Sequence, residues 1–176
     1  FGEVIPGDKI LGLLAVHEQE YKRLLNNNFV ATIHSNSGLD MSLKQQGIVL
    51  HRADVGDRKV AEMMRNKKSN LGGESSGHLI ASDFLPTGDG LLTALLVARA
   101  SYESGKSIDS LSDKITLWPS LEGAFRVNKK IPIQECESLS SNLSKAKARL
   151  GKDGRVLLRY SGTEPKIRLL EDATQK

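Results

Sequence analysis

Short runs of β-branched residues alternate with longer helical stretches through the first two thirds of the chain, and this alternation restricts the fold more than any other feature. "FVATIH" (29–34) and "IVLHRAD" (48–54) have the length and composition of strands. Each is followed by a stretch with the apolar periodicity of a helix. Strands that alternate with helices at this spacing pair mainly in parallel. We therefore predict an α/β domain over residues 1–118, with a mixed, mostly parallel sheet and packed helices.

Acidic residues mark the expected starts of three helices. Asp8 precedes "KILGLLAVHEQEYKRLL", Asp57 precedes "RKVAEMMRNKK", and Asp89 precedes "GLLTALLVARASYES". A carboxylate at such a position can accept a hydrogen bond from an unpaired backbone N–H of the first turn. Gly105 is expected to end the third helix. Residues 70–81 are expected to form a loop rich in glycine and serine, followed by one short strand.

The pattern changes after "WPS" (118–120), where the regular alternation stops. The later order is strand, helix, strand, strand, which predicts a small α+β domain with an antiparallel sheet over residues 119–176. The four expected elements are "AFRVNKKIPI" (124–133), "CESLSSNLSKAKARLG" (136–151), "RVLLRY" (155–160) and "KIRLL" (166–170).

The composition is that of an ordinary globular protein, and it argues against several classes of function. Hydrophobic residues make up 39% of the chain, and the net charge of +4 is spread among acidic neighbours instead of forming a basic tract. Aromatic residues make up only 5%, so no stacking platform for nucleic acid is expected. The single cysteine, Cys136, excludes a disulfide within the chain and fits a cytoplasmic protein. No apolar run reaches the roughly 20 residues that span a membrane.

The segment "RYSGTEPKIR" interrupts a strand pattern with many hydrogen-bond donors. Arg159 and Arg168 bracket the hydroxyls of Ser161 and Thr163, and Gly162 lets a ligand approach the backbone closely. The planar guanidinium group matches two phosphate oxygens at once, and hydroxyl and backbone N–H groups add further donors. We interpret the segment as a phosphate-binding loop. The same residues also fit an ordinary hairpin with exposed arginines.

A second polar loop, "GGESSGH" (72–78), combines groups that suit sugar hydroxyls. Glu74 accepts hydrogen bonds, Ser76 both donates and accepts, and His78 can transfer a proton near neutral pH. The alternative interpretation is a plain surface loop. No other Cys, His or carboxylate stands at metal-ligand spacing, so we expect no metal site in this chain.

The third loop, "VGDRKV", places Gly56, Asp57 and Arg58 directly after an expected strand. Taken alone, Asp57 fits a helix cap and Arg58 a solvated surface residue. The three loops, in this order and together with "ATIHSNSGLD" and "TGDGLLTALL", resemble the α-D-phosphohexomutase superfamily over nearly the whole chain. "LGGESSGH" is similar to its sugar-binding loop, and "GRVLLRYSGTEPKIR" to the phosphate-binding loop of its fourth domain. "VGDR" and "SGTEP" favour the branch that acts on glucosamine phosphate.

The resemblance implies that the chain corresponds to the third and fourth domains of an isomerase. Such an enzyme moves a phosphoryl group between the 6- and 1-positions of glucosamine phosphate, a step toward UDP-N-acetylglucosamine and cell-wall precursors. Residues 1–118 would bind the sugar and residues 119–176 the phosphate. His78 is also the candidate for proton transfer in catalysis. The implied substrate-binding residues are Gly56, Asp57, Arg58, Glu74, Ser76, His78, Arg159, Ser161, Gly162, Thr163 and Arg168.

The family's chemistry uses a phosphoserine donor, a Mg²⁺ ion held by a D-x-D-x-D loop, and a glucosamine 1,6-bisphosphate that serves as intermediate and activator. Neither the phosphoserine motif nor the metal loop occurs in this sequence. The resemblance therefore implies that Mg²⁺ binds to a domain absent from this chain, that the missing N-terminal domains of the same protein are its partners, and that the chain alone is inactive. Two alternatives remain: part of a phosphomannomutase or phosphoglucomutase, and a non-catalytic phosphosugar-binding module.

Overall fold

The computed structural model describes residues 2–174, and the chain forms two compact units, Phe1–Leu117 and Trp118–Lys176. "WPS" therefore begins the second unit. Each unit has its own sheet, and the two are described separately below. Within the described residues, no helix is both long enough and apolar enough to cross a membrane.

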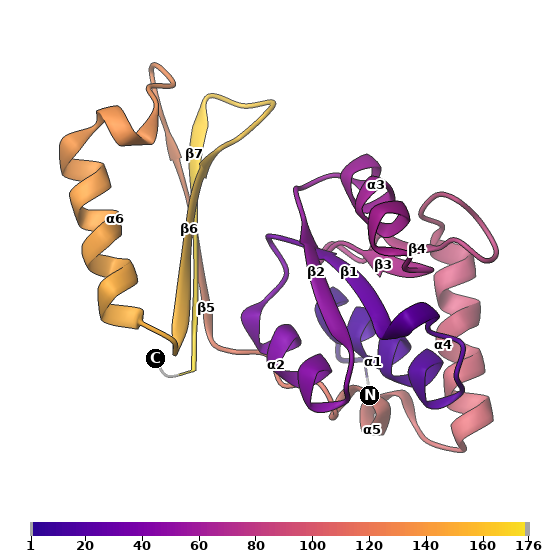
Figure 1. Ribbon diagram of the computed structural model, residues 1–176. Coiled ribbons are helices and arrows are strands. Elements are labelled where there is room, and N and C mark those ends of the chain that lie inside the picture. The colour runs from indigo at the N-terminus through magenta and orange to yellow at the C-terminus, as the bar shows by residue number, and fades with distance from the viewer. Residues whose placement is uncertain (1, 175–176) are drawn as a thin grey trace. The chain divides into compact units, whose positions relative to one another are not determined.

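The sheet of the first unit has four strands in the order β2-β1-β3-β4 (Figure 1). β1 (Asn28–Thr32) lies in the middle and pairs in parallel with β2 (Val49–Ala53) and with β3 (Leu71–Gly73). β4 (Leu79–Ala81) pairs antiparallel with β3. The predicted mixed, mostly parallel sheet is thus confirmed. Residues 70–81 contain two short strands, where the sequence suggested one, because the glycine- and serine-rich turn folds them back on each other.

Helices pack on both faces of this sheet. The alternation along β1 shows the two layers, since Phe29 and Ala31 lie in one hydrophobic cluster and Val30 lies in the other. Phe29 is completely buried, and burying such a side chain stabilises the fold by about 1.5–3 kcal/mol. The helices are α1 (Gly7–Glu20), α2 (Ser37–Gln45), α3 (Asp57–Lys67), α4 (Gly90–Ser104) and α5 (Ile108–Ser112); a 3₁₀ turn, η1, covers Leu25–Asn27.

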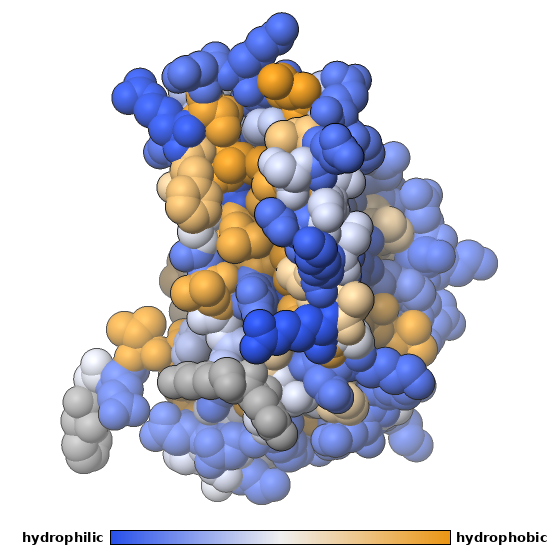
Figure 2. All heavy atoms as spheres, turned by 90° about the vertical axis from the view of Figure 1, so that its left-hand side faces the viewer, coloured by the Kyte–Doolittle hydropathy of each residue, from blue (hydrophilic) through white to orange (hydrophobic). Residues whose placement is uncertain are grey.

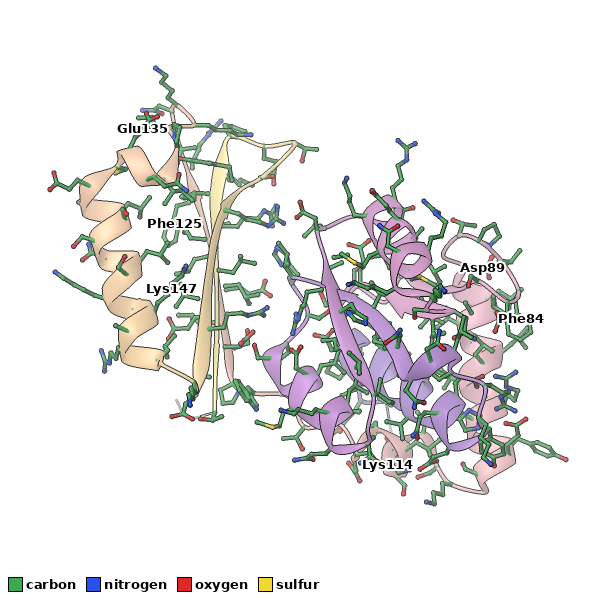
Figure 3. All side chains as sticks on the ribbon, viewed as in Figure 1. Phe84, Asp89, Lys114, Phe125, Glu135 and Lys147 are labelled. Carbon is green, nitrogen blue, oxygen red and sulfur yellow. The ribbon has the colours of Figure 1, made fainter. Side chains whose placement is uncertain are left out.

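Two of the three acidic residues expected at helix starts, Asp89 and Asp8, have different roles. Asp89 caps α4 and accepts a hydrogen bond from the N–H of Leu92 at 2.6 Å (Figure 3), and Gly105 ends this helix with a positive φ of 65°. Asp8 does not cap α1, because Pro6 occupies that position. Its buried carboxylate instead accepts the N–H of Asn36 at 2.8 Å, so it joins two distant segments.

The second unit is a three-stranded antiparallel sheet with one helix, as predicted. Its strands β5 (Ser120–Arg126), β6 (Gly154–Tyr160) and β7 (Lys166–Ala173) lie in the order β5-β7-β6. The expected strand 124–133 starts earlier and ends earlier. Pro132 is followed by a 3₁₀ turn, η2 (Ile133–Glu135), which separates this strand from α6 (Glu137–Leu150).

α6 covers one face of this small sheet, but none of its residues is fully buried. A mostly apolar groove of about 520 Å³ lies between the helix and the strands. Figure 2, which views this unit from its α6 side, shows hydrophobic side chains gathered in a strip. Phe125 of β5 points into the space between sheet and helix (Figure 3).

Candidate functional site

The predicted sugar-binding residues lie at one edge of the first unit's sheet. β1, β2 and β3 run in the same direction, so their carboxyl ends meet at this edge. The segments that follow them are 33–36, 54–56 and 74–78. In open sheets of this kind, ligands bind at the carboxyl ends of the strands. The topology therefore collects two of the predicted loops where a ligand site is expected.

A direct hydrogen bond joins two of these loops. The backbone N–H of Gly56 donates to Oε2 of Glu74 at 3.2 Å. Gly56 has a φ of 117°, which side-chain-bearing residues rarely adopt, so a glycine is needed to present its N–H in this direction. The carboxylate of Glu74 keeps further lone pairs for a ligand, since an ionised carboxylate accepts about four hydrogen bonds.

The loop that carries Glu74 is a tight turn. The N–H of Glu74 donates to the carbonyl of His78, and the N–H of Gly77 donates to the carbonyl of Glu74, both at 2.9 Å. Ser76 and His78 are exposed at the surface of this turn. The start of α1 packs beneath it, because a β-carbon on Gly7 would collide with the carbonyl of Ser75.

His78 is held from the side by the loop before α4. A β-carbon on Gly88 would collide with the imidazole ring of His78, so the glycine provides the space that the ring occupies. The imidazole is thereby placed beside the turn while it stays exposed to solvent.

Asp57 and Arg58 lie at the start of α3, directly after Gly56. Gly56 occupies the N-cap position, so the idea that Asp57 caps the helix is wrong. The Asp57 carboxylate accepts the neighbouring N–H of Arg58 at 2.7 Å. Both side chains are exposed, and Arg58 is the nearest basic residue in sequence to the Gly56–Glu74 contact.

Arg52 on β2 is a residue that sequence reasoning missed. Its guanidinium group donates to the carbonyls of Thr32 at 2.8 Å and Asn36 at 3.2 Å, and also to the carbonyl of Ser35 and the carboxylate of Asp40. It therefore fixes the loop between β1 and α2 at the same edge of the sheet. A lone arginine within a strand gives no sequence signal for this role.

In the second unit, the predicted phosphate loop connects β6 to β7. Arg159 and Arg168 are paired directly across the two strands, so their side chains share a face of the sheet. The N–H of Ser161 donates to the carbonyl of Lys166 at 2.8 Å, which closes the loop. The structure thus places the two predicted arginines opposite each other on the strands that flank this turn. Figure 1 shows the turn between β6 and β7.

The residues within the loop differ in exposure. Gly162 and Thr163 form its exposed tip. Ser161 is only 5% exposed, and its hydroxyl accepts the N–H of Glu164 at 3.3 Å. Ser161 therefore shapes the turn, while the tip presents a hydroxyl and a glycine backbone to solvent.

Two further side chains brace this loop, and neither contact was predicted from the sequence. The ammonium group of Lys130 donates to the carbonyl of Ser161 at 2.6 Å. The hydroxyl of Tyr160 donates to the carbonyl of Ile131 at 2.7 Å and accepts its N–H at 3.3 Å. The segment after β5 is thereby tied to the base of the loop.

Glu164 and Lys166 also belong to this site, although only the arginines were singled out from the sequence. Glu164 bonds to Lys166 at 2.5 Å and to Arg168 at 2.7 Å. The hydrogen bond from Lys166, followed by that from Arg168, holds the pKa of Glu164 below its usual range. Glu164 is therefore a carboxylate at neutral pH, in contact with two cations.

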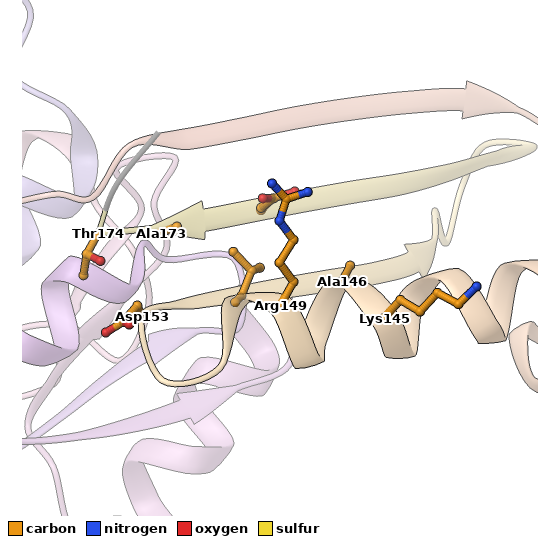
Figure 4. Close-up of a pocket in the computed structure, with 8 residues that line it drawn as sticks. Lys145, Ala146, Arg149, Asp153, Ala173 and Thr174 are labelled. Carbon is orange, nitrogen blue, oxygen red and sulfur yellow. The ribbon is translucent and has the colours of Figure 1, made fainter.

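The described residues do not fit a Mg²⁺ site. Among residues 2–174, no group of three or more His, Cys, Asp and Glu side chains is placed to hold a metal ion. A hollow of about 790 Å³ does occur in the second unit, between the last turns of α6 and the far ends of β6 and β7 (Figure 4). It lies at the opposite end of the hairpin from the 161–165 loop, and none of the predicted site residues lines it.

Family models match both units. Residues 6–117 match "Phosphoglucomutase/phosphomannomutase, alpha/beta/alpha domain III", and residues 122–176 match "Phosphoglucomutase/phosphomannomutase, C-terminal domain".

Similar full sequences carry the name phosphoglucosamine mutase. The proteins of Maricaulis maris (strain MCS10) and Bartonella bacilliformis are 43% and 42% identical over 99% of this chain. The chain spans about 39% of the length of these curated relatives.

Solved structures of related enzymes share the fold. An N-acetylglucosamine-phosphate mutase in its substrate complex superposes with a TM-score of 0.78 at 19% identity, over 97% of this chain and 41% of its own. An Aspergillus fumigatus N-acetylphosphoglucosamine mutase, in complex with GlcNAc-6P and magnesium, superposes with a TM-score of 0.77 at 16% identity. The superposition covers 98% of this chain and 44% of the Aspergillus chain. With the family models, these likenesses confirm the resemblance seen in the sequence. The chain therefore belongs to the phosphoglucomutase/phosphomannomutase family, within the phosphohexomutases, and carries its domain III followed by its C-terminal domain.

Proposed function

We propose that this chain supplies the sugar- and phosphate-binding loops of a phosphoglucosamine mutase, which interconverts glucosamine 6-phosphate and glucosamine 1-phosphate. The observation that carries the proposal is the identity of 43% over 99% of the chain with a relative of that name. Because the chain spans only 39% of that relative, the activity belongs to the longer protein, and the chain alone is inactive.

In the first unit, which we expected from the sequence to span residues 1–118, the sugar-binding group consists of Gly56, Asp57, Arg58, Glu74, Ser76 and His78. The hydrogen bond between Gly56 and Glu74 supports this assignment, since it joins two of the loops at the edge where ligands bind to open sheets. Glu74 and Ser76 would hold sugar hydroxyls, and a carboxylate suits vicinal hydroxyls because it accepts from both. His78, exposed beside them, is the candidate for proton transfer.

In the second unit, which we expected from the sequence to span residues 119–176, the phosphate-binding group consists of Arg159, Ser161, Gly162, Thr163 and Arg168. The direct cross-strand pairing of Arg159 with Arg168 supports this assignment. Like charges opposite each other destabilise a sheet unless something offsets them. Glu164 already offsets the charge of Arg168 through one hydrogen bond of 2.7 Å. A bound phosphate dianion would offset both arginines, because it accepts the planar donors of both guanidinium groups.

Mg²⁺ and a glucosamine 1,6-bisphosphate complete the proposal, along with a phosphoserine on another domain of the same protein. The Aspergillus fumigatus relatives support it, because one was solved with magnesium and another with glucose 1,6-bisphosphate. When bound, Mg²⁺ would neutralise charge on the phosphoryl group in transfer. The residues of this chain would only bind and orient the phosphosugar. The phosphosugar substrate and the single cysteine favour a cytoplasmic protein.

The test is a substrate panel with the full-length protein. We expect kcat/KM for glucosamine 6-phosphate to exceed that for glucose 6-phosphate and mannose 6-phosphate. A preference for glucose or mannose phosphate would assign the protein to the phosphoglucomutase or phosphomannomutase branch. Binding of phosphosugar without turnover of any of the three would identify a non-catalytic module.

A further inference from the structure

Four basic side chains share one face of the β5-β7-β6 sheet, at the end next to the 161–165 loop. Arg126 is paired in register with Lys166, and Arg159 is paired with Arg168. Residues paired across antiparallel strands point to the same face, and Lys166 and Arg168 are two positions apart on β7. All four cations therefore lie on the face opposite the apolar groove beside α6.

The carboxylate of Glu164 bridges two of these cations. One oxygen, Oε1, accepts from Lys166 at 2.5 Å, and the other, Oε2, accepts from Arg168 at 2.7 Å. The side chains of Glu164, Lys166 and Arg168 are 38%, 39% and 42% exposed. Ion pairs this open to water exchange partners easily and contribute little to stability. The bridge can therefore give way to a more strongly charged anion.

The backbone of the loop does not depend on this bridge. The N–H of Glu164 donates to the hydroxyl of Ser161 at 3.3 Å, and the carbonyl of Glu164 accepts the N–H of Lys166 at 2.8 Å. The Glu164 side chain can thus rotate away from the cations while the turn keeps its shape.

We propose that Glu164 is the internal counter-ion of the phosphate-binding loop: it holds Lys166 and Arg168 when no phosphate is bound, and a phosphate group displaces it from both. The proposal rests on the phosphate-binding role proposed above and extends it. Glu164 offsets the like charges on the sheet in the empty protein. It also competes with the ligand, so it limits the affinity and favours release of the phosphosugar. Lys166 becomes a third cation that contacts the bound phosphate.

The experiment measures binding of inorganic phosphate to the full-length protein by isothermal titration calorimetry, for wild type and four variants. Glu164→Gln keeps the shape of the side chain and removes its charge, and Glu164→Asp keeps the charge on a shorter side chain. Glu137→Gln is the matched control, because Glu137 is exposed at the start of α6 on the other side of the sheet. Arg168→Ala tests the loop itself. Thermal unfolding of each variant checks that it is folded.

We expect Glu164→Gln to bind phosphate roughly three- to tenfold more tightly than wild type, since two exposed ion pairs no longer have to be broken. Glu164→Asp should lie near wild type, and Glu137→Gln should match it. Weaker or unchanged binding by Glu164→Gln would overturn the proposal, as would equal tightening by Glu137→Gln. If Arg168→Ala binds phosphate as well as wild type does, the phosphate-binding role itself fails. If Arg168→Ala binds weakly and Glu164→Gln does not bind tightly, only the counter-ion role fails.

Discussion

Replacement of Glu74 separates its structural contact from its proposed role in sugar binding. Glu74→Ala removes the acceptor for the N–H of Gly56, a single hydrogen bond of 3.2 Å at the surface of the first unit. Such a bond contributes about 0.5–1.5 kcal/mol to stability. The free energy of unfolding should therefore fall by no more than this amount.

The expected loss of activity is larger. If the carboxylate also accepts hydrogen bonds from sugar hydroxyls, each charge-assisted bond is worth about 1.5–3 kcal/mol, so kcat/KM for glucosamine 6-phosphate should fall roughly 10- to 100-fold. Glu74→Gln keeps an oxygen for the N–H of Gly56 but loses the charge. It should retain wild-type stability and still lose activity.

The assays are urea unfolding and steady-state turnover of the full-length protein, with Glu62→Ala as the control. Glu62 lies on the exposed face of α3, where it pairs only loosely with Lys59 at 3.4 Å. Glu62→Ala should change neither the free energy of unfolding nor kcat/KM by much. The reasoning is refuted if Glu74→Gln keeps full activity, or if Glu74→Ala unfolds far more easily while the folded fraction turns over normally.

Three further predictions concern the stability of the first unit. Phe29→Ala should lower the free energy of unfolding, measured by urea denaturation, by about 3–5 kcal/mol, because Phe29 is completely buried on β1. A decrease in unfolding free energy no larger than that caused by replacing an exposed residue would contradict this. Asp89→Ala should cost about 1 kcal/mol in the same assay by removing the α4 cap, and an unchanged midpoint would exclude the cap. Burial raises the pKa of Glu18, but hydrogen bonds from Arg23 and Arg99 outweigh it and hold the pKa below its usual range. This stabilisation is fully present above the pKa of the unfolded chain and is lost as the pH falls through the lower folded-state pKa. Glu18→Gln should therefore flatten the acid limb of the plot of unfolding free energy against pH, and an equally steep limb would disprove this.

Elements defined by local sequence were predictable. The parallel strands followed from β-branched runs between helical stretches, and the α4 cap and its terminal glycine followed from residues adjacent to the helix. These features depend on contacts within a few residues. They therefore leave a pattern in the sequence that propensity and periodicity can read.

Features set by distant contacts were not predictable in this way. Asp8 looks like a helix cap, yet its carboxylate binds an N–H that lies 28 residues away. The position of Arg52 within a strand does not reveal the carbonyls it binds around the β1–α2 loop. Such contacts depend on how separate loops meet in the folded unit, and that information is not local.

In the candidate sites, too, some residues could be predicted from the sequence and some contacts could not. Motif residues such as Arg159 and Glu74 could be found from their chemistry and from the resemblance to a family. The bridge formed by Glu164 could not, because an acidic residue within a phosphate loop argues against anion binding until its two cation partners are known.

The most direct test of the central claim is the affinity of the full-length protein for glucosamine 6-phosphate with and without Arg159. Arg159 faces Arg168 across β6 and β7, so both can bind one phosphate group. Titration calorimetry should show that Arg159→Ala binds about 10- to 100-fold more weakly, corresponding to 1.5–3 kcal/mol. Arg159→Lys should recover only part of this loss, because lysine lacks the planar fork. Unchanged affinity in Arg159→Ala would contradict the claim and would leave the loop as an ordinary turn between two strands.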